Sequence, residues 1–128
     1  DEALMKNAVR IRKVFGGNMR QVGYLAAAGL YALENNINRL KDDHSKAKDI
    51  ETVLKTLPFI QSVEPVETNI IIFELQKGIN ESAFVQKLDD NGIKIIGMGS
   101  GKLRIVTHLD YTNVMHDKFL SVLRKLEF

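Results

Sequence analysis

The sequence contains no cysteine, little net charge and no long hydrophobic run, and each absence narrows the class of protein. Without cysteine there is neither a disulfide framework nor a thiolate zinc site. No apolar segment approaches the roughly 20 residues that a membrane-spanning helix needs. A formal net charge of +2, with acidic residues interspersed throughout, gives no support for nucleic-acid binding. We therefore expect a protein without membrane or nucleic-acid partners, and a reducing compartment such as the cytoplasm.

The residues that are present are typical of one globular domain. The chain has 128 residues, of which 45% are hydrophobic and 27% charged. A chain of this length can bury a hydrophobic core without disulfides or a structural metal. Its start, Asp1-Glu2-Ala3-Leu4-Met5, has neither the basic lead nor the apolar centre of a secretory signal, and no initiating methionine. We therefore expect an internal start within a longer polypeptide.

The first part of the chain is predicted to be helical. Apolar residues recur at spacings of three and four from Glu2 to about Phe15, and Gly16-Gly17 ends that pattern. A second helix is predicted from about Met19 to Leu33. After Asn35-Asn36 the helical pattern resumes until Pro58 closes it. The asparagine pair therefore indicates a break between two helices.

The rest of the chain alternates between short strands and helices. The expected elements are strands at 62–64, 69–75, 94–96 and 102–107, a helix at 80–91 and a last helix at 111–126. On that last helix we expect Met115, Phe119, Val122, Leu123 and Leu126 to face inward. Asn80 can cap its helix and Gly92 can terminate it, and residues 97–101 form a hairpin loop. The strand at 69–75 has apolar residues on both faces, which predicts a central, covered strand. The fold class is therefore α+β, a mainly antiparallel sheet with helices on one face.

Two apparent motifs fail when their spacing is checked. Gly97, Gly99 and Gly101 before Lys102 resemble a phosphate-binding loop, but an earlier glycine is missing and Leu103 replaces the magnesium-binding hydroxyl, so a plain hairpin is favoured. The segment 42–44 offers two aspartates and a histidine, but adjacent helical residues point about 100° apart, so a solvated helix face is favoured. We expect no metal site.

Two arginines stand where a charged side chain needs a partner. Arg104 alternates with Leu103 and Ile105, so in a strand its guanidinium projects to the opposite face, alongside apolar residues. A guanidinium is a rigid fork of donors that matches a carboxylate. A salt bridge to a local acid such as Glu74 explains the pattern equally well. Arg20 is predicted in the first turn of a helix, where main-chain amides also attract anions. The two arginines suggest an anion site.

An ordered set of short segments then resembles one enzyme family. The segments are Arg12-Lys13, Gly16-Gly17, Met19-Arg20-Gln21, Ala26-Ala27-Ala28-Gly29-Leu30, Asp43-His44, Thr68-Asn69 and Leu103-Arg104-Ile105-Val106-Thr107-His108-Leu109-Asp110. Together they resemble the low-specificity threonine aldolases, pyridoxal-phosphate (PLP) enzymes of fold type I, over nearly the whole chain. The part they resemble is the C-terminal one. The resemblance implies that residues 1–18 lead out of a missing large domain and that residues 19–128 form the small domain.

The resemblance also implies roles for individual residues. Arg104 matches the family's arginine that binds the substrate carboxylate. Lys13 and Arg20 match residues that approach the active site of a neighbouring subunit, near the cofactor phosphate and the hydroxyl end of the substrate; interface duty is the alternative. Asn69 and His108 match positions for which we expect support of the Arg104 strand. The implied reaction is cleavage of threonine or allo-threonine to glycine and acetaldehyde, in a homotetramer built as a dimer of dimers.

Two parts of the family's catalytic machinery are absent from the sequence. The lysine that anchors the cofactor stands in a serine-lysine-glycine motif, and no lysine here has that setting. The histidine that stacks on the cofactor ring also lies outside these residues. We therefore expect no catalytic residue in this chain, no PLP bound to it and no turnover by the chain alone.

Two other classes of protein remain open from the sequence. The chain resembles the small domain of other fold-type-I PLP enzymes as well, such as a β-eliminating lyase, an aminotransferase-like enzyme or a racemase, which cleave other bonds. A non-catalytic regulatory module that binds an amino acid between subunits has the same α+β pattern. The residues that precede Asp1 distinguish the first class, and calorimetry with threonine and glycine distinguishes the second.

Overall fold

The computed structural model describes all residues from Asp1 to Phe128, in two compact units, 1–38 and 39–128. Unit 1 holds α1 (Glu2–Val14) and α2 (Gly23–Asn35). The Asp1 carboxylate caps α1 by accepting from the amides of residues 3 and 4, and Gly16, with φ +78°, lies just past its end. The helix break at the asparagine pair and the end of α1 at the diglycine are confirmed. The predicted division of the whole protein after residue 18 stays a prediction.

The second helix begins later than the sequence indicated. It starts at Gly23 rather than Met19, because Gln21 adopts a φ of 58° that no α-helix contains. Arg20 therefore lies in the turn before α2 and not in its first turn. No side chain of α1 or α2 is buried, although many of them are large and apolar.

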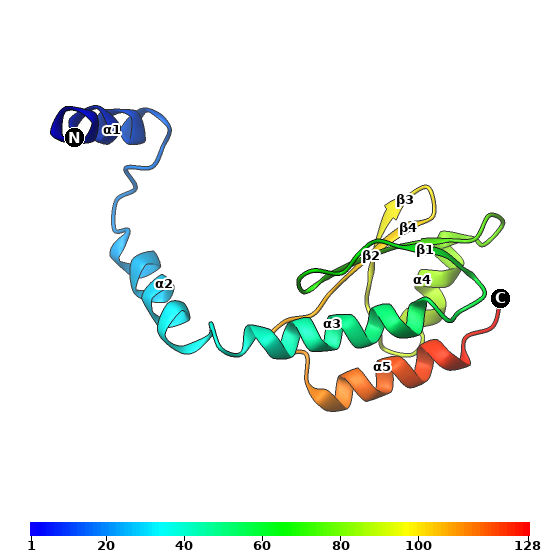
Figure 1. Cartoon of the computed structure of the whole chain (residues 1–128). Coiled ribbons are helices and arrows are strands. Elements are labelled where there is room, and N and C mark those ends of the chain that lie inside the picture. Colours follow the sequence, from blue (N-terminus) through cyan, green and yellow to red (C-terminus); the bar gives the residue numbers. More distant parts are fainter. The chain divides into compact units, whose positions relative to one another are not determined.

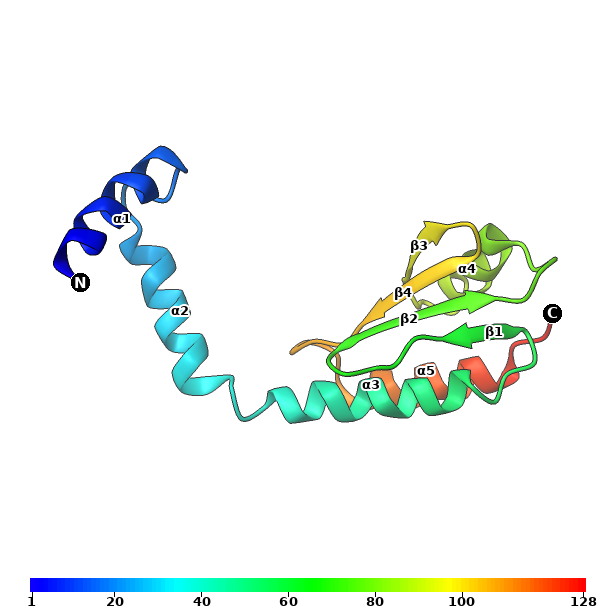
Figure 2. The ribbon, with the colours of Figure 1, turned by 45° about the horizontal axis from the view of Figure 1, so that its top comes forward.

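Unit 2 contains the sheet. Its elements are α3 (Leu40–Leu54), β1 (Ile60–Val63), β2 (Ile70–Leu75), α4 (Glu81–Asp89), β3 (Ile96–Gly99), β4 (Lys102–Val106) and α5 (Asn113–Lys125). The four strands are antiparallel in the order β1-β2-β4-β3, with α3 and α5 running side by side along the sheet (Figures 1 and 2). The predicted α+β class is confirmed.

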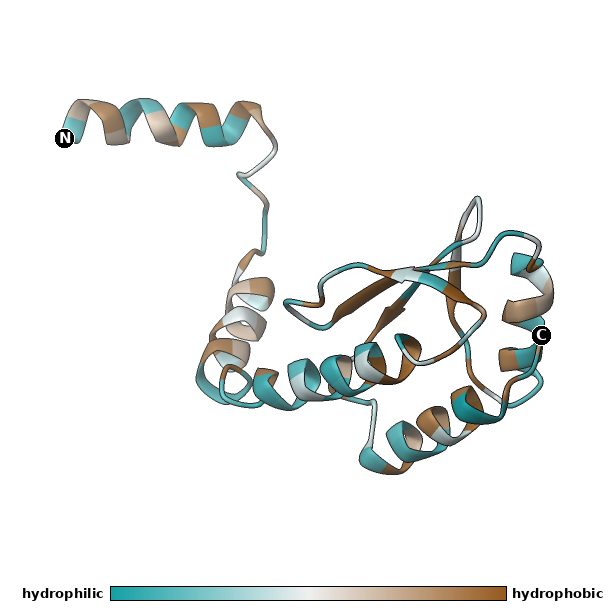
Figure 3. Ribbon diagram, turned by 45° about the vertical axis from the view of Figure 1, so that its right-hand side comes forward, coloured by the Kyte–Doolittle hydropathy of each residue, from teal (hydrophilic) through white to brown (hydrophobic).

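One face of the sheet carries the hydrophobic core. Ile71, Phe73 and Leu75 of β2 alternate inward and meet Leu103 of β4, while α3, α4 and α5 close the core from the same side. Brown, hydrophobic residues concentrate on the strands in Figure 3 and alternate with teal ones along α3 and α5. Phe84 of α4 is fully buried at the centre of this core.

The other face of the sheet is open within these residues. The sequence predicted that β2 is central, which is confirmed, and covered on both faces, which is wrong for this chain. Ile70 is 44% exposed and its register partner Val106 is 42% exposed. The next row across the sheet is Ile72, Arg104 and Ile96. An arginine thus lies between two isoleucines on the uncovered face.

The hairpin between β3 and β4 is shorter than predicted, because β3 runs from Ile96 to Gly99 and not from 94 to 96. Only Ser100 and Gly101 lie between the two strands, and together with Gly99, the last residue of β3, they have positive φ. The Glu81 carboxylate of α4 accepts from the amide of Gly101 at 2.9 Å and from that of Gly99 at 3.3 Å. A Cβ on Gly97 would collide with the same carboxylate. The glycine-rich segment thus binds an internal carboxylate. The close approach of that carboxylate explains why a glycine occupies position 97 within β3.

The ends of α4 follow the prediction, and one inward position of α5 does not. The Asn80 side chain accepts from the amide of Ala83 at 3.0 Å, and Gly92 has φ +75°. On α5, Met115 was expected inside but is 53% exposed, and His116 is buried instead. His116, Phe119 and Leu123 follow the spacing of zero, three and seven, which places the histidine on the core side of the helix.

Candidate functional site

Arg104 lies at the centre of the candidate site. Strand alternation directs Leu103 into the core and Arg104 to the opposite face, as predicted. Its Nε atom is buried and has no hydrogen-bond partner. None of the chain's ion pairs includes Arg104. The alternative salt bridge to Glu74 is not formed, because Glu74 lies opposite Lys102 in the register.

A cavity of about 490 Å³ adjoins Arg104. It lies between residues 92–96, the end of β4 and α5, because β3 begins at Ile96 and leaves the last two residues of β4 without a partner on that side. Its apolar walls include Ile93, Ile95 and Phe119, and the charged groups on it are cations. Such a cavity is suited to a small anion with an apolar body.

Asn69 is joined to the end of the Arg104 strand. Its side-chain Nδ2 donates to the carbonyl of Thr107 at 2.7 Å, and the amide of Thr107 donates to the carbonyl of Asn69 at 3.0 Å. This two-way contact ties Asn69 to the residue that follows β4, and its role toward Arg104 stays a prediction. His108 is exposed, lines the Arg104 cavity, and accepts through Nδ1 from the amide of Asp110 at 3.3 Å. Its hydrogen bond thus lies within its own turn.

Lys13 and Arg20 lie in unit 1, and both are exposed. Lys13 belongs to the last turn of α1. The expected combination of Arg20 with main-chain donors of a helix start is wrong, because α2 begins at Gly23 and Arg20 lies in the preceding turn. The roles of both residues stay predictions.

The segment 42–44 is the predicted solvated face only in part, because Asp42 is exposed and His44 half-buried, whereas Asp43 is buried. The Asp43 side chain is only 4% exposed, and its two oxygens accept from the guanidinium of Arg39 at 2.8 and 3.0 Å. The carboxylate can be buried because this two-pronged pair satisfies both oxygens. No three histidine, aspartate or glutamate side chains of the chain converge in a way that could hold a metal ion.

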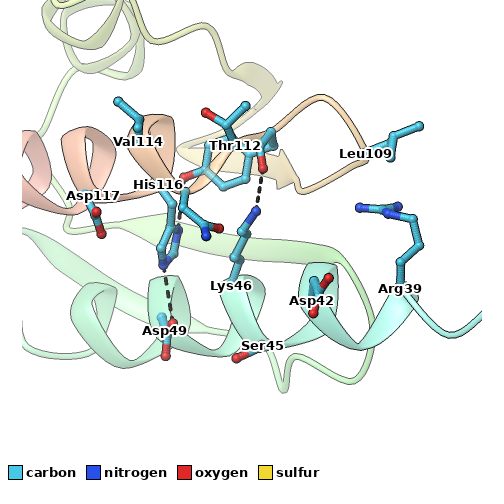
Figure 4. A pocket seen from close by; sticks show the side chains of 12 residues that line it. Arg39, Asp42, Ser45, Lys46, Asp49, Leu109, Thr112, Val114, His116 and Asp117 are labelled. Atoms are coloured by element: carbon cyan, nitrogen blue, oxygen red, sulfur yellow. Dashed lines mark hydrogen bonds and ion pairs between the residues drawn. The ribbon is translucent and has the colours of Figure 1, made fainter.

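A second, more open cleft of about 750 Å³ between α3 and α5 was missed from the sequence (Figure 4). His116 lies 3.3 Å from Asp49 through Nε2 and 3.2 Å from the Tyr111 hydroxyl through Nδ1. Lys46 donates to the carbonyl of Tyr111 at 2.6 Å. Since a carboxylate only accepts, Nε2 of a neutral His116 donates to Asp49 and Nδ1 accepts from Tyr111. The network joins α5 to α3.

The chemistry of this network is limited by Tyr111. Burial, and to a smaller extent the nearby charge of Asp117, raise the pKa of the Tyr111 hydroxyl above its usual value of 10.0. The tyrosine therefore stays protonated and donates at neutral pH. With no serine or cysteine among Lys46, Asp49, Tyr111 and His116, the network offers no side-chain nucleophile of the kind used by serine and cysteine hydrolases. The inward spacing of His116 on α5 is the signal that could have found it.

Comparison with known proteins gives the family. A profile of the beta-eliminating lyase family matches residues 1–77. Low-specificity L-threonine aldolase 1 of Arabidopsis thaliana is 38% identical over 114 residues, which cover 87% of this chain and 32% of that protein. The low specificity L-threonine aldolase of Escherichia coli (strain K12) is 38% identical over 106 residues, which cover 83% of this chain and 30% of that protein. The chain spans about a third of the length of these relatives, and it belongs to the beta-eliminating lyase family.

Solved structures agree on the fold at low sequence identity. A C-DES mutant with glycine covalently linked to its PLP cofactor matches with a TM-score of 0.61 and 17% identity, over 82% of this chain and 28% of that one. Ornithine aminotransferase of Toxoplasma gondii ME49 matches with a TM-score of 0.58 and 19% identity, over 69% and 22%. The fold is that of the small domain of fold-type-I PLP enzymes. None of the helices combines the length and hydrophobicity of a membrane span.

Proposed function

We propose that this chain is the C-terminal part of a PLP-dependent aldolase that cleaves threonine and allo-threonine to glycine and acetaldehyde. Its contribution is to bind the substrate carboxylate through Arg104. The similarity to threonine aldolases over most of the chain supports this reaction. The missing two thirds of such a protein supply the large domain.

The single observation that carries the proposal is the buried, unpartnered Nε of Arg104. A buried donor of a charged group costs free energy unless it gains a partner. No acid of this chain provides one, and the cavity beside Arg104 has room for a small ligand. A substrate carboxylate fits the guanidinium fork and would satisfy this donor. The exposed isoleucines around Arg104 suggest that the large domain covers this face and excludes water.

The residues present fit a supporting role toward the cofactor rather than an anchoring one. When bound to the whole enzyme, PLP supplies the sink for the electron pair released at the substrate α-carbon. No lysine here stands in a serine-lysine-glycine setting, and Lys46, which follows a serine, is engaged with the carbonyl of Tyr111. Lys13 and Arg20 stay candidates for contacts near the cofactor phosphate of a neighbouring subunit. We further propose that the whole enzyme is cytoplasmic and a homotetramer. Sedimentation of the whole enzyme would measure its oligomeric state.

The test of the carboxylate site uses the full-length protein that contains this chain. Arg104→Ala should raise the KM for threonine at least ten-fold, because the carboxylate contact is made in the ground state as well as the transition state, and each factor of ten corresponds to about 1.4 kcal/mol. Lys102→Ala is the matched control: Lys102 lies on the same strand and face but pairs with Glu64 at 3.4 Å. An unchanged KM in Arg104→Ala, or an equal rise in Lys102→Ala, would remove Arg104 from the site.

The chain by itself should be inactive. We expect no acetaldehyde from threonine and no absorbance of a lysine-bound cofactor when the isolated chain is mixed with PLP, because the anchoring lysine is absent. Spectrophotometry of the mixture checks both expectations. Sustained release of acetaldehyde, or the absorbance of about one lysine-bound cofactor per chain, would contradict the proposal that the isolated chain is inactive.

A further inference from the structure

Thr107, the residue that follows β4, is fully buried and carries a hydroxyl that the proposed carboxylate site does not use. Its Oγ1 donates to the main-chain carbonyl of Asp43, in the first turn of α3, at 2.8 Å. The two residues are 64 positions apart in the sequence. This bond therefore fastens the end of β4 to a helix on the core side of the sheet.

The acceptor of this bond is itself held in place. The Asp43 carboxylate is gripped by Arg39 through two hydrogen bonds of 2.8 and 3.0 Å, and its side chain is 4% exposed. Buried charge pairs with both oxygens satisfied resist displacement, because loss of one partner leaves an uncompensated charge. The first turn of α3 therefore holds the carbonyl that accepts from Thr107 in a fixed position.

The end of β4 depends on this hydrogen bond because its last residues pair with a neighbouring strand on one side only. Opposite β3 the pairing stops at Arg104, which faces Ile96. Ile105 and Val106 pair with β2 alone, and the cavity occupies the space on their other side. Arg104 has no ion-pair partner that could fix its own guanidinium. The direction of that side chain therefore depends on where the strand backbone lies.

We propose that Thr107, through its hydrogen bond to the main-chain carbonyl of Asp43, is a positioning residue that orients Arg104 toward the substrate carboxylate. The proposal rests on the function proposed above for Arg104. Thr107 acts through the strand and does not touch the substrate. A displaced strand would leave the guanidinium fork misaligned, and misalignment of such a clamp is costly because bidentate hydrogen bonds are directional.

The test is a double-mutant cycle in the full-length enzyme. Thr107→Val keeps the shape and removes the hydroxyl, while Thr107→Ser keeps the hydroxyl and serves as the conservative control. Each is made with Arg104 and with Arg104→Ala, and kcat/KM, KM and the thermal midpoint are measured. We expect Thr107→Val to raise the KM for threonine about five- to ten-fold with kcat changed less than about three-fold, Thr107→Ser to stay near the parent, and Thr107→Val to add nothing when Arg104 is absent.

Every outcome of the cycle decides between positioning and mere structure. A loss of kcat/KM by Thr107→Val that is equal in both backgrounds, a fall in kcat without a rise in KM, or a Thr107→Ser variant as impaired as Thr107→Val would overturn the proposal. If Arg104→Ala itself leaves KM unchanged, the carboxylate assignment falls and this proposal with it. If Arg104→Ala raises KM and Thr107→Val does not, only the role of Thr107 falls.

A second variant covers the case in which Thr107→Val does not fold. Arg39→Lys keeps the charge beside Asp43 but loses the two-pronged grip. It should raise KM about two- to three-fold with Arg104 present and leave kcat/KM unchanged when Arg104 is alanine. An effect of the same size in both backgrounds would again assign the cluster to stability alone.

Discussion

Residues 1–38 and residues 39–128 use their apolar side chains in opposite ways. The second unit buries fifteen hydrophobic side chains in one core, whereas the first unit buries none. Local signals bound α1, namely the capping Asp1 and the terminating Gly16, whereas α2 has no side-chain cap at its start. Local signals alone stabilise short helices only marginally in water. The comparison shows that unit 2 carries its own stability, while the apolar surface of unit 1 is suited to contact with other protein.

The largest expected effect on stability comes from removing one aromatic side chain of unit 2, compared with removing one of unit 1. Phe84 is fully buried against Phe73, with ring centroids 6.0 Å apart, and Phe15 is 84% exposed. Phe84→Ala should lower the free energy of unfolding by about 3–5 kcal/mol because it leaves a cavity. Phe15→Ala should change it by less than about 0.5 kcal/mol. Chemical denaturation of the isolated chain measures both, and equal losses would contradict the contrast.

A smaller effect compares a buried carboxylate with an exposed one. Hydrogen bonds from Lys55 at 2.8 Å and Lys48 at 3.0 Å lower the pKa of Glu51 from 4.5 to about 2, against an opposing effect of burial. Since the folded pKa is the lower one, the stabilisation is complete above pH 4.5 and is lost as the pH falls toward 2. Glu51→Gln should cost about 1–3 kcal/mol at pH 7.

The pH profile of stability checks this carboxylate. The parent chain should lose stability more steeply than Glu51→Gln between pH 4.5 and about 2, as followed by urea unfolding at each pH. The control is Glu2→Gln in α1, which removes an ion pair to Lys6 whose side chains are 85% and 75% exposed. Such a surface pair contributes about 0–1 kcal/mol. Parallel profiles for the parent and Glu51→Gln would show that Glu51 is not the titrating group.

The smallest expected effect comes from removing unit 1 altogether. A chain of residues 39–128 should keep the cooperative unfolding transition, with the free energy of unfolding changed by less than about 1 kcal/mol, because no buried side chain is lost. Its solubility should rise, since exposed apolar residues such as Leu25 and Tyr31 go with the deleted helices. Denaturation and light scattering measure the two properties. A broad, non-cooperative transition would show that the units depend on each other.

The elements were predictable where one short segment decides them. Asn80 caps α4 through an amide three residues away, and Gly92 ends it through a positive φ, so both can be read locally. Arg104 was placed on its face of β4 by the two-residue period of a strand. The late start of α2 at Gly23 was not predictable in this way, because the helical pattern runs through Gln21 without a visible interruption.

The features that escaped the sequence join residues that are distant along the chain. The Glu81 carboxylate reaches the amide of Gly101, and the Thr107 hydroxyl reaches the carbonyl of Asp43. Neither pair has a characteristic spacing, because helix and strand packing sets the distance. His116 had a local signal in the inward spacing of α5, but its partner Asp49 lies on α3.

By itself, the sequence determined which segments are helices or strands, the antiparallel α+β class and the face from which Arg104 projects, since periodicity and capping act over a few residues. Only the tertiary structure decided that no acid of this chain pairs with Arg104, that a cavity opens beside it, and that Asp43 and Thr107 are buried together. Such properties depend on which surfaces meet, and packing brings those surfaces together from positions that no local pattern relates.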